Sequence, residues 1–155
     1  MLSPTDRIPW FLSVSSPLEH RAACRRNHRA YRHLGDECPD WKAVVLFYWA
    51  LHYVELYFAL SNKHYSSHYD RLPAVGKSCP ADVYKAYHRL EQESKKARYM
   101  ENGNFCMSAR AVDRELRRQK LRAIQKFVLG EVRTKARLVG HFRPSSFAAT
   151  KRPIA

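Results

Sequence analysis

The longest apolar stretch of the chain, from Ala43 to Leu60, predicts a central helix. Its apolar residues recur at steps of three and four, in two adjacent stripes. One stripe contains Val44, Phe47, Leu51, Val54 and Phe58, and the other contains Leu46, Trp49, Tyr53, Leu56 and Leu60. Asp40 is the expected N-cap, and the helix is expected to end near Ser61. A helix that is apolar on most sides is either surrounded by other helices or inserted in a membrane.

A membrane span is the weaker of these two interpretations. The stretch has 18 residues, which is barely enough to cross a bilayer. His52 and Glu55 lie near its middle, where ionisable groups are costly. The sequence contains no second stretch of this kind. We therefore expect the helix to be surrounded by others, with no membrane partner.

Further helices are predicted on both sides of this stretch. Ser16-Pro17-Leu18-Glu19 combines an N-cap, a proline at the first helical position and a capping-box glutamate, and Gly35 is the expected end. A short helix is expected over residues 65–72, ended by Pro73. Longer ones are expected over residues 80–99 and 107–129, the last ended by Gly130. No useful strand pattern is present, so the predicted fold class is all-α, a four- to five-helix up-and-down bundle.

The net charge of +14 is concentrated towards the C-terminus. Residues 1–106 hold 15 Lys and Arg against 11 Asp and Glu, whereas residues 107–155 hold 13 against 3. We expect a helical domain over residues 16–130 and a basic, partly disordered tail over residues 131–155. Such a charge favours an anionic partner, with nucleic acid ahead of a membrane surface.

The last predicted helix has a basic outward face. Because acidic residues are scarce there, this face predicts nucleic-acid binding, mostly through phosphates. The alternative is an ordinary solvated basic face. The predicted nucleic-acid-binding residues are Arg110, Arg114, Arg117, Arg118 and Arg122.

The four cysteines indicate a reducing environment. Cys24, Cys38, Cys79 and Cys106 show no C-x-x-C spacing, which argues against a zinc knuckle or a redox pair. They are also too few for a disulfide scaffold in a chain of this length. The first residues lack the charged and apolar regions of a secretory signal. We therefore expect a cytoplasmic protein.

Titratable side chains interrupt the central apolar stretch. Tyr48, His52 and Glu55 are spaced four and three apart, so they share one helix face. A buried glutamate needs a cationic or hydrogen-bonding partner. The nearest sources are the segment containing His68 and Arg71 and the residue Arg98. Two interpretations stay open: a structural polar network, or a pocket in which His52 transfers protons.

Two further histidines lie just beyond the central stretch. His64 and His68 are four apart and would point the same way on one helix. With His52 they are numerous enough for a metal site. No metal-binding motif accompanies them, however, so we expect no metal and no cofactor.

Several short motifs over residues 20–100 resemble those of a group of small HEPN-type proteins. They are Asp40-Trp41, Phe47-Tyr48, Ala50-Leu51-His52, His68-x-x-Arg71, Tyr87-x-x-Leu90 and Ala97-Arg98-Tyr99. The resemblance implies an α-helical bundle, commonly a homodimer, that binds RNA or a nucleotide. It also implies a place in a two-component toxin–antitoxin or defence system, with a partner protein.

The same resemblance raises a catalytic alternative. HEPN ribonucleases are metal-independent and use an R-x(4–6)-H motif near the last helices. Here Arg137 precedes His141 by three intervening residues and Arg133 precedes it by seven. The motif is therefore absent from that position, and whether the chain is an enzyme stays open. If it is an endoribonuclease, the predicted catalytic residues are His52, His68 and Arg71. A purely structural or protein-interaction bundle is the third alternative.

Overall fold

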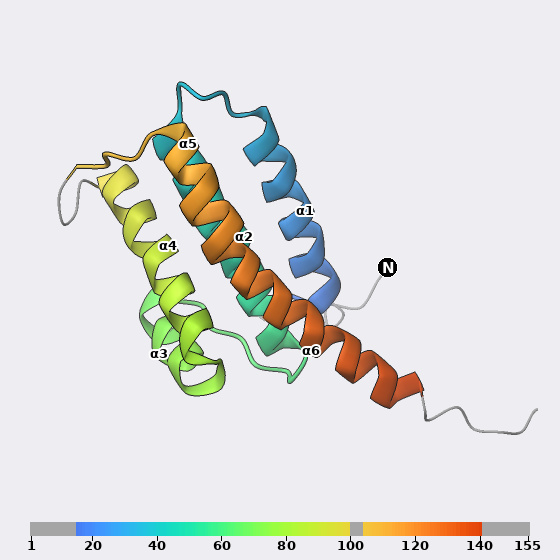
Figure 1. The fold of residues 1–155 in the computed structure, drawn as a ribbon. Coiled ribbons are helices and arrows are strands. Elements are labelled where there is room, and N and C mark those ends of the chain that lie inside the picture. Colours follow the sequence, from blue (N-terminus) through green and yellow to red (C-terminus); the bar gives the residue numbers. More distant parts are fainter. Residues whose placement is uncertain (1–14, 100–103, 141–155) are drawn as a thin grey trace, which may run out of the picture.

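The computed structural model describes residues 15–99 and 104–140 as an all-α bundle (Figure 1). Its elements are α1 (Pro17–His33), α2 (Pro39–Ala59), α3 (His68–Ser78), α4 (Ala81–Tyr99), α5 (Ala109–Ala111), the π-helix η2 (Val112–Leu121) and α6 (Arg122–Gly140). The last three follow one another directly and form one long helix. In Figure 1, α1, α2, α4 and this last helix run alternately up and down, and α3 lies at the lower end. The predicted all-α fold class is confirmed.

Helix α2 lies at the centre of the bundle. The helices α1, α4, η2 and α6 all pack against it. The stripe of Val44, Phe47, Leu51, Val54 and Phe58 is buried throughout, and most of the second stripe is buried as well. Within the described residues, no helix combines the length and hydropathy needed to cross a bilayer. The apolar surface of α2 is therefore covered by the other helices, as the pattern predicted.

The starts of α1 and α2 illustrate one correct and one wrong prediction. At α1 the predicted capping box is present: Ser16 Oγ accepts a hydrogen bond from the backbone of Glu19, and Glu19 accepts one from the backbone of Ser16. At α2 the prediction of Asp40 as N-cap is wrong. Cys38 occupies that position without a side-chain bond, and Pro39 is the first helical residue. Proline suits this position because its missing N–H would be unpaired there anyway.

Helix α3 begins and ends later than predicted. Ser67 caps it, accepting a hydrogen bond from the backbone N–H of Asp70 at 3.0 Å. The helix continues through Pro73 to Ser78. Pro73 cannot bond to the carbonyl of Tyr69, but both residues are exposed, so water can solvate that carbonyl. His64 lies before this helix, and the prediction that His64 and His68 share a helix face is wrong.

The long last helix passes through its predicted end. Gly130 lies inside α6, and a Cβ atom at this position would meet nothing within 4 Å. Beyond it, Val132 packs against the core, and Lys135 Nζ donates to the carbonyl of Leu60 at 2.8 Å. These contacts outweigh the helix penalty of one glycine. The predicted boundary at residue 131 thus falls within α6, and residues 141–155 of the predicted tail lie outside the described residues.

Candidate functional site

Glu55 and Arg71 form a buried ion pair between α2 and α3. Glu55 is 4% exposed and Arg71 is 5% exposed. Arg71 Nε donates to Glu55 Oε1, and Arg71 Nη2 donates to the carbonyl of Tyr65. A third nitrogen, Nη1, lies 3.3 Å from Nδ1 of His68. Arg71 is therefore the cationic partner that a buried glutamate requires, and the structure brings the predicted residues Glu55, Arg71 and His68 together.

His52, a second predicted residue of α2, contacts α1 instead. His52 Nδ1 lies 3.4 Å from Nδ1 of His20. The His20 ring stacks on that of His64, with 5.8 Å between centroids, and His64 Nδ1 lies 3.8 Å from Glu55 Oε2. A continuous set of contacts therefore links six side chains, here termed the polar layer: His20, His52, Glu55, His64, Arg71 and His68.

His20 is the member of the polar layer that sequence analysis missed. Its position on the buried face of α1 could have been inferred, because it lies three residues before Ala23 and four before Cys24, both buried. Leu18, the first large apolar residue of α1, is by contrast 74% exposed. The buried face of α1 thus carries a histidine beside small apolar residues.

Arg98 belongs to a separate cluster. Its Nη1 donates to the hydroxyl of Tyr48 at 3.0 Å, and its guanidinium lies over the rings of Tyr48 and Tyr99. Arg98 thus joins the end of α4 to α2 through aromatic side chains. In the part of the chain that the structure describes, neither a hydrogen bond nor an ion pair joins Arg98 to Glu55.

Burial lowers the pKa of three imidazoles of the polar layer, those of His20, His52 and His68. It lowers the pKa of His52 to about 4, and the nearby His20, Arg26 and Arg71 act in the same direction. Burial is also the largest cause that lowers the pKa of His20 and of His68. A neutral imidazole presents one N–H donor and one lone pair, so these groups can accept hydrogen bonds or ligate a metal.

The three predicted catalytic residues do not meet in one open pocket. His52 borders a hollow of about 320 Å³ with His20 and Arg26, whereas Arg71 is sealed within the bundle. Among the described residues, no hydrogen bond or ring contact joins His52 to His68 or to Arg71. The geometry therefore resembles a structural network more than a phosphate-cleaving centre.

A second candidate site is a basic surface on α1 and the last helix, both of which pack on α2. Exposed arginines of α1 were missed by sequence analysis, which considered only the C-terminal helix. They are Arg21, Arg25, Arg26, Arg29 and Arg32. Exposed basic residues of the last helix are Arg110, Arg114, Arg118, Arg122, Lys126, Arg133 and Arg137.

Three of the five predicted nucleic-acid-binding arginines form ion pairs with carboxylates. Arg117 and Arg118 donate to Asp113, and Arg114 donates to Glu115 at 2.7 Å. Asp113 is shared because the wider π-helix lets a residue contact one five positions on. Within the described residues, no ion pair joins Arg110 or Arg122 to a carboxylate. These two keep their charge available for an anionic ligand.

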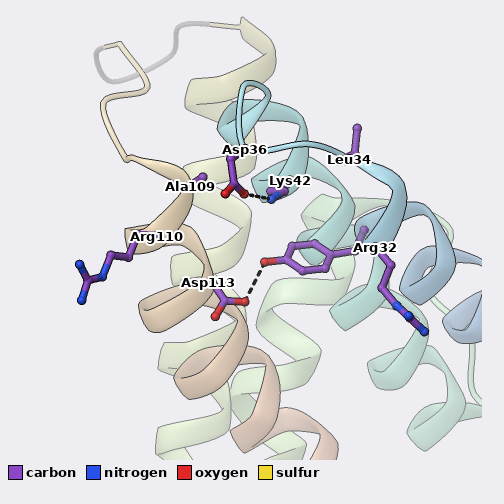
Figure 2. Close-up of a pocket in the computed structure, with 8 residues that line it drawn as sticks. Arg32, Leu34, Asp36, Lys42, Ala109, Arg110 and Asp113 are labelled. Atoms are coloured by element: carbon purple, nitrogen blue, oxygen red, sulfur yellow. Dashed lines mark hydrogen bonds and ion pairs between the residues drawn. The ribbon is translucent and has the colours of Figure 1, made fainter.

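Two hollows lie between α1 and the last helix, one towards each end. The first, of about 480 Å³, is lined in part by Arg32 and Arg110 (Figure 2). Figure 2 shows Arg110 at the left and Arg32 at the right, pointing away from each other, with the Lys42–Asp36 ion pair and the hydrogen bond from Tyr31 to Asp113 between them. The second hollow, also about 480 Å³, is bordered by Arg21 and Arg133. Both hollows therefore carry one arginine from each helix.

No protein-family model, curated protein or solved structure matches the chain. The HEPN resemblance therefore stays a prediction from the sequence motifs.

Proposed function

We propose that the chain is a HEPN-like helical module that binds RNA across the basic surface of α1 and the last helix. The observation that carries this proposal is that each hollow is bordered by one arginine from each helix. Arg32 and Arg110 border the first hollow, and Arg21 and Arg133 border the second. None of the four has a carboxylate partner among the described residues. Two walls of unpaired guanidinium groups suit a phosphate backbone, which guanidinium binds through two parallel hydrogen bonds.

Binding of this kind depends mainly on phosphates and only weakly on base sequence. The sequence resemblance to HEPN proteins is the reason to propose RNA ahead of DNA. It also leads us to propose a cytoplasmic role within a two-component toxin–antitoxin or defence system.

The sealed ion pair of Arg71 supports binding over catalysis. An arginine that steadies a reacting phosphate must touch it, but Arg71 is buried and its charge is balanced by Glu55. The arginines of the basic surface reach solvent instead. We therefore propose that the anionic ligand contacts the outer surface of the bundle and that the polar layer lies inside, below that surface.

A matched pair of triple variants tests the location of this surface. The first replaces Arg32, Arg110 and Arg133 with glutamine. The control replaces three exposed lysines with glutamine. Lys63 lies in the loop before α3, Lys77 on α3 and Lys85 on α4. Both variants remove three positive charges, so a difference between them reports position and not net charge.

Affinity for a labelled single-stranded RNA is measured by fluorescence anisotropy at moderate salt. The first variant is expected to weaken binding by about tenfold or more, since three phosphate contacts are lost. The control is expected to bind like the unmodified chain. Equal weakening of both variants would place the contact elsewhere, and no binding by the unmodified chain would refute the function. Equal affinity for DNA of the same sequence would remove RNA as the preferred partner.

A further inference from the structure

Three metal-ligating side chains from different parts of the chain converge inside the bundle. They are His20 of α1, Glu55 of α2 and His64 of the loop before α3. One ligand atom of each lies within 4.8 Å of the other two. In a tetrahedral site with bonds of about 2.1 Å, ligand atoms stand about 3.4 Å apart. From this convergence we propose that His20, Glu55 and His64 bind a divalent transition-metal ion such as Zn²⁺.

His20 has a buried nitrogen that the described residues leave without a partner. The residue is only 7% exposed, and its Nε2 has no hydrogen bond among the described residues. Leaving a buried polar atom unpaired costs about 1–3 kcal/mol, and a metal bond removes this cost. Native structures rarely keep such an atom without a reason.

His52 supplies the support that a ligating histidine usually has. When His20 Nδ1 donates its hydrogen to His52 Nδ1, 3.4 Å away, the lone pair of His20 resides on Nε2. Ligating histidines commonly donate their other N–H in this way, which sets the tautomer and the ring orientation. This arrangement accounts for a histidine in the most apolar helix of the chain. His52 is thus a positioning residue and not a ligand.

One carboxylate oxygen of Glu55 accepts a hydrogen bond from Arg71, and the other is the proposed metal ligand. Oε1 accepts from Arg71 Nε, and Oε2 faces His64 Nδ1 at 3.8 Å. This distance is too long for a hydrogen bond but close to the separation of two ligands of one ion. The bond from Arg71 orients the carboxylate, as partners of ligating carboxylates generally do.

The ligand set also indicates the class of ion and its route. Two imidazoles and one carboxylate suit Zn²⁺ and similar ions, whereas Ca²⁺ and Mg²⁺ prefer oxygen ligands throughout. His20 and Glu55 are buried, but the His64 side chain is 26% exposed. The ion therefore enters from the side of His64, where water takes the fourth position.

Cobalt binding tests the site directly. Metal-free, tag-free full-length protein is titrated with Co²⁺ and followed by its visible absorption, and Zn²⁺ is then added. We expect one equivalent of Co²⁺ with a tetrahedral spectrum that Zn²⁺ displaces. His64→Ala and His20→Gln are expected to lower the affinity by about tenfold or more, and His52→Gln by about 10- to 100-fold. His33→Ala, which changes an exposed histidine of α1, is the control and should bind normally.

Three results would overturn the proposal. They are the absence of stoichiometric binding, equal affinity in the His64→Ala variant and the control, or a thiolate-to-cobalt charge-transfer band, which would place the ion on cysteine. Because His64 is partly exposed, its variant keeps the test decisive even if His20→Gln does not fold. The outcome is independent of RNA binding, which involves other residues.

Discussion

At the scale of single residues, the Glu55–Arg71 pair explains how charged groups persist in the most apolar part of the chain. Each buried ion loses several kcal/mol of hydration, which mutual attraction offsets only with good geometry and further hydrogen bonds. Arg71 has these additional contacts at Tyr65 and His68. The pair therefore ties α3 and the loop before it to the central helix.

Removing both partners of this pair is expected to cost less than the sum of the two single losses. In metal-free buffer, Arg71→Met and Glu55→Gln should each lower the free energy of unfolding by about 3–5 kcal/mol, because an uncompensated group stays buried. The double variant should lose clearly less than the sum. Urea denaturation measures all three. As control, Glu115→Gln breaks an exposed pair and should change stability by less than about 1 kcal/mol. Additive losses at Glu55 and Arg71 would show that the two side chains are not coupled.

Asp113 gives a prediction for acid. It accepts hydrogen bonds from Arg117, Arg118 and Tyr31, and the Arg117 bond is the largest cause that lowers its pKa to about 2. A carboxyl whose pKa is lower in the folded than in the unfolded protein stabilises the fold above the unfolded pKa. This contribution is lost as the pH falls towards 2. We expect Asp113→Asn to cost about 1 kcal/mol at pH 6, after allowance for solvent screening.

Comparing Asp113→Asn with the unmodified protein over a range of pH separates this effect from general acid unfolding. Unfolding free energies of Asp113→Asn and of the unmodified protein are measured by urea denaturation from pH 6 downwards. Their difference should shrink between pH 4 and the lowest pH at which the protein folds. A difference that is constant with pH would show that the Asp113 carboxylate contributes nothing through its charge.

The sequence predicted the partner of Glu55 but not that of His52. Arg71 was identifiable because a buried glutamate needs a cation and the next segment offers one. His20 was not, because the buried face of α1 has few large apolar residues and Leu18 lies outside it. A histidine's partner can be a donor, an acceptor or an ion, so its chemistry constrains the search less.

At the scale of elements, the start and end signals were less reliable than the apolar pattern. Pro73 and Gly130 both lie within helices that they were predicted to end. Each costs a limited amount of local helix stability, which packing of Val75 and Val132 exceeds. The π-helix η2 could not be predicted either, since its register depends on what it packs against. The apolar stripes, in contrast, correctly located α2 and its buried faces.

Gly130 therefore offers a simple stabilising substitution. Gly130→Ala is expected to raise the free energy of unfolding by about 0.5–1 kcal/mol, because alanine has the higher helix propensity. The added methyl group meets nothing within 4 Å, so no clash opposes the gain. Urea denaturation with Gly130→Pro as a contrasting, helix-breaking variant measures the effect. A destabilising alanine would contradict the continuous helix through this residue.

At the scale of the whole molecule, fold class and charge were predictable, but the shape of the basic surface was not. The apolar periods and the +14 charge predicted a helical bundle with an anionic partner. They did not show that α1 adds its arginines to those of the last helix. That arrangement depends on both helices packing against α2. Likewise, the sequence could not show that three of the predicted nucleic-acid-binding arginines form ion pairs with Asp113 or Glu115.

The salt dependence of RNA affinity tests the central claim most directly. For single strands the logarithm of the binding constant falls by about 0.7 per neutralised phosphate for each tenfold rise in salt. Replacing Arg32, Arg110 and Arg133 with glutamine should therefore reduce this slope by about 2, whereas replacing Lys63, Lys77 and Lys85 should leave it unchanged. An unchanged slope in the arginine variant, or an equal reduction in the lysine variant, would contradict binding across α1 and the last helix.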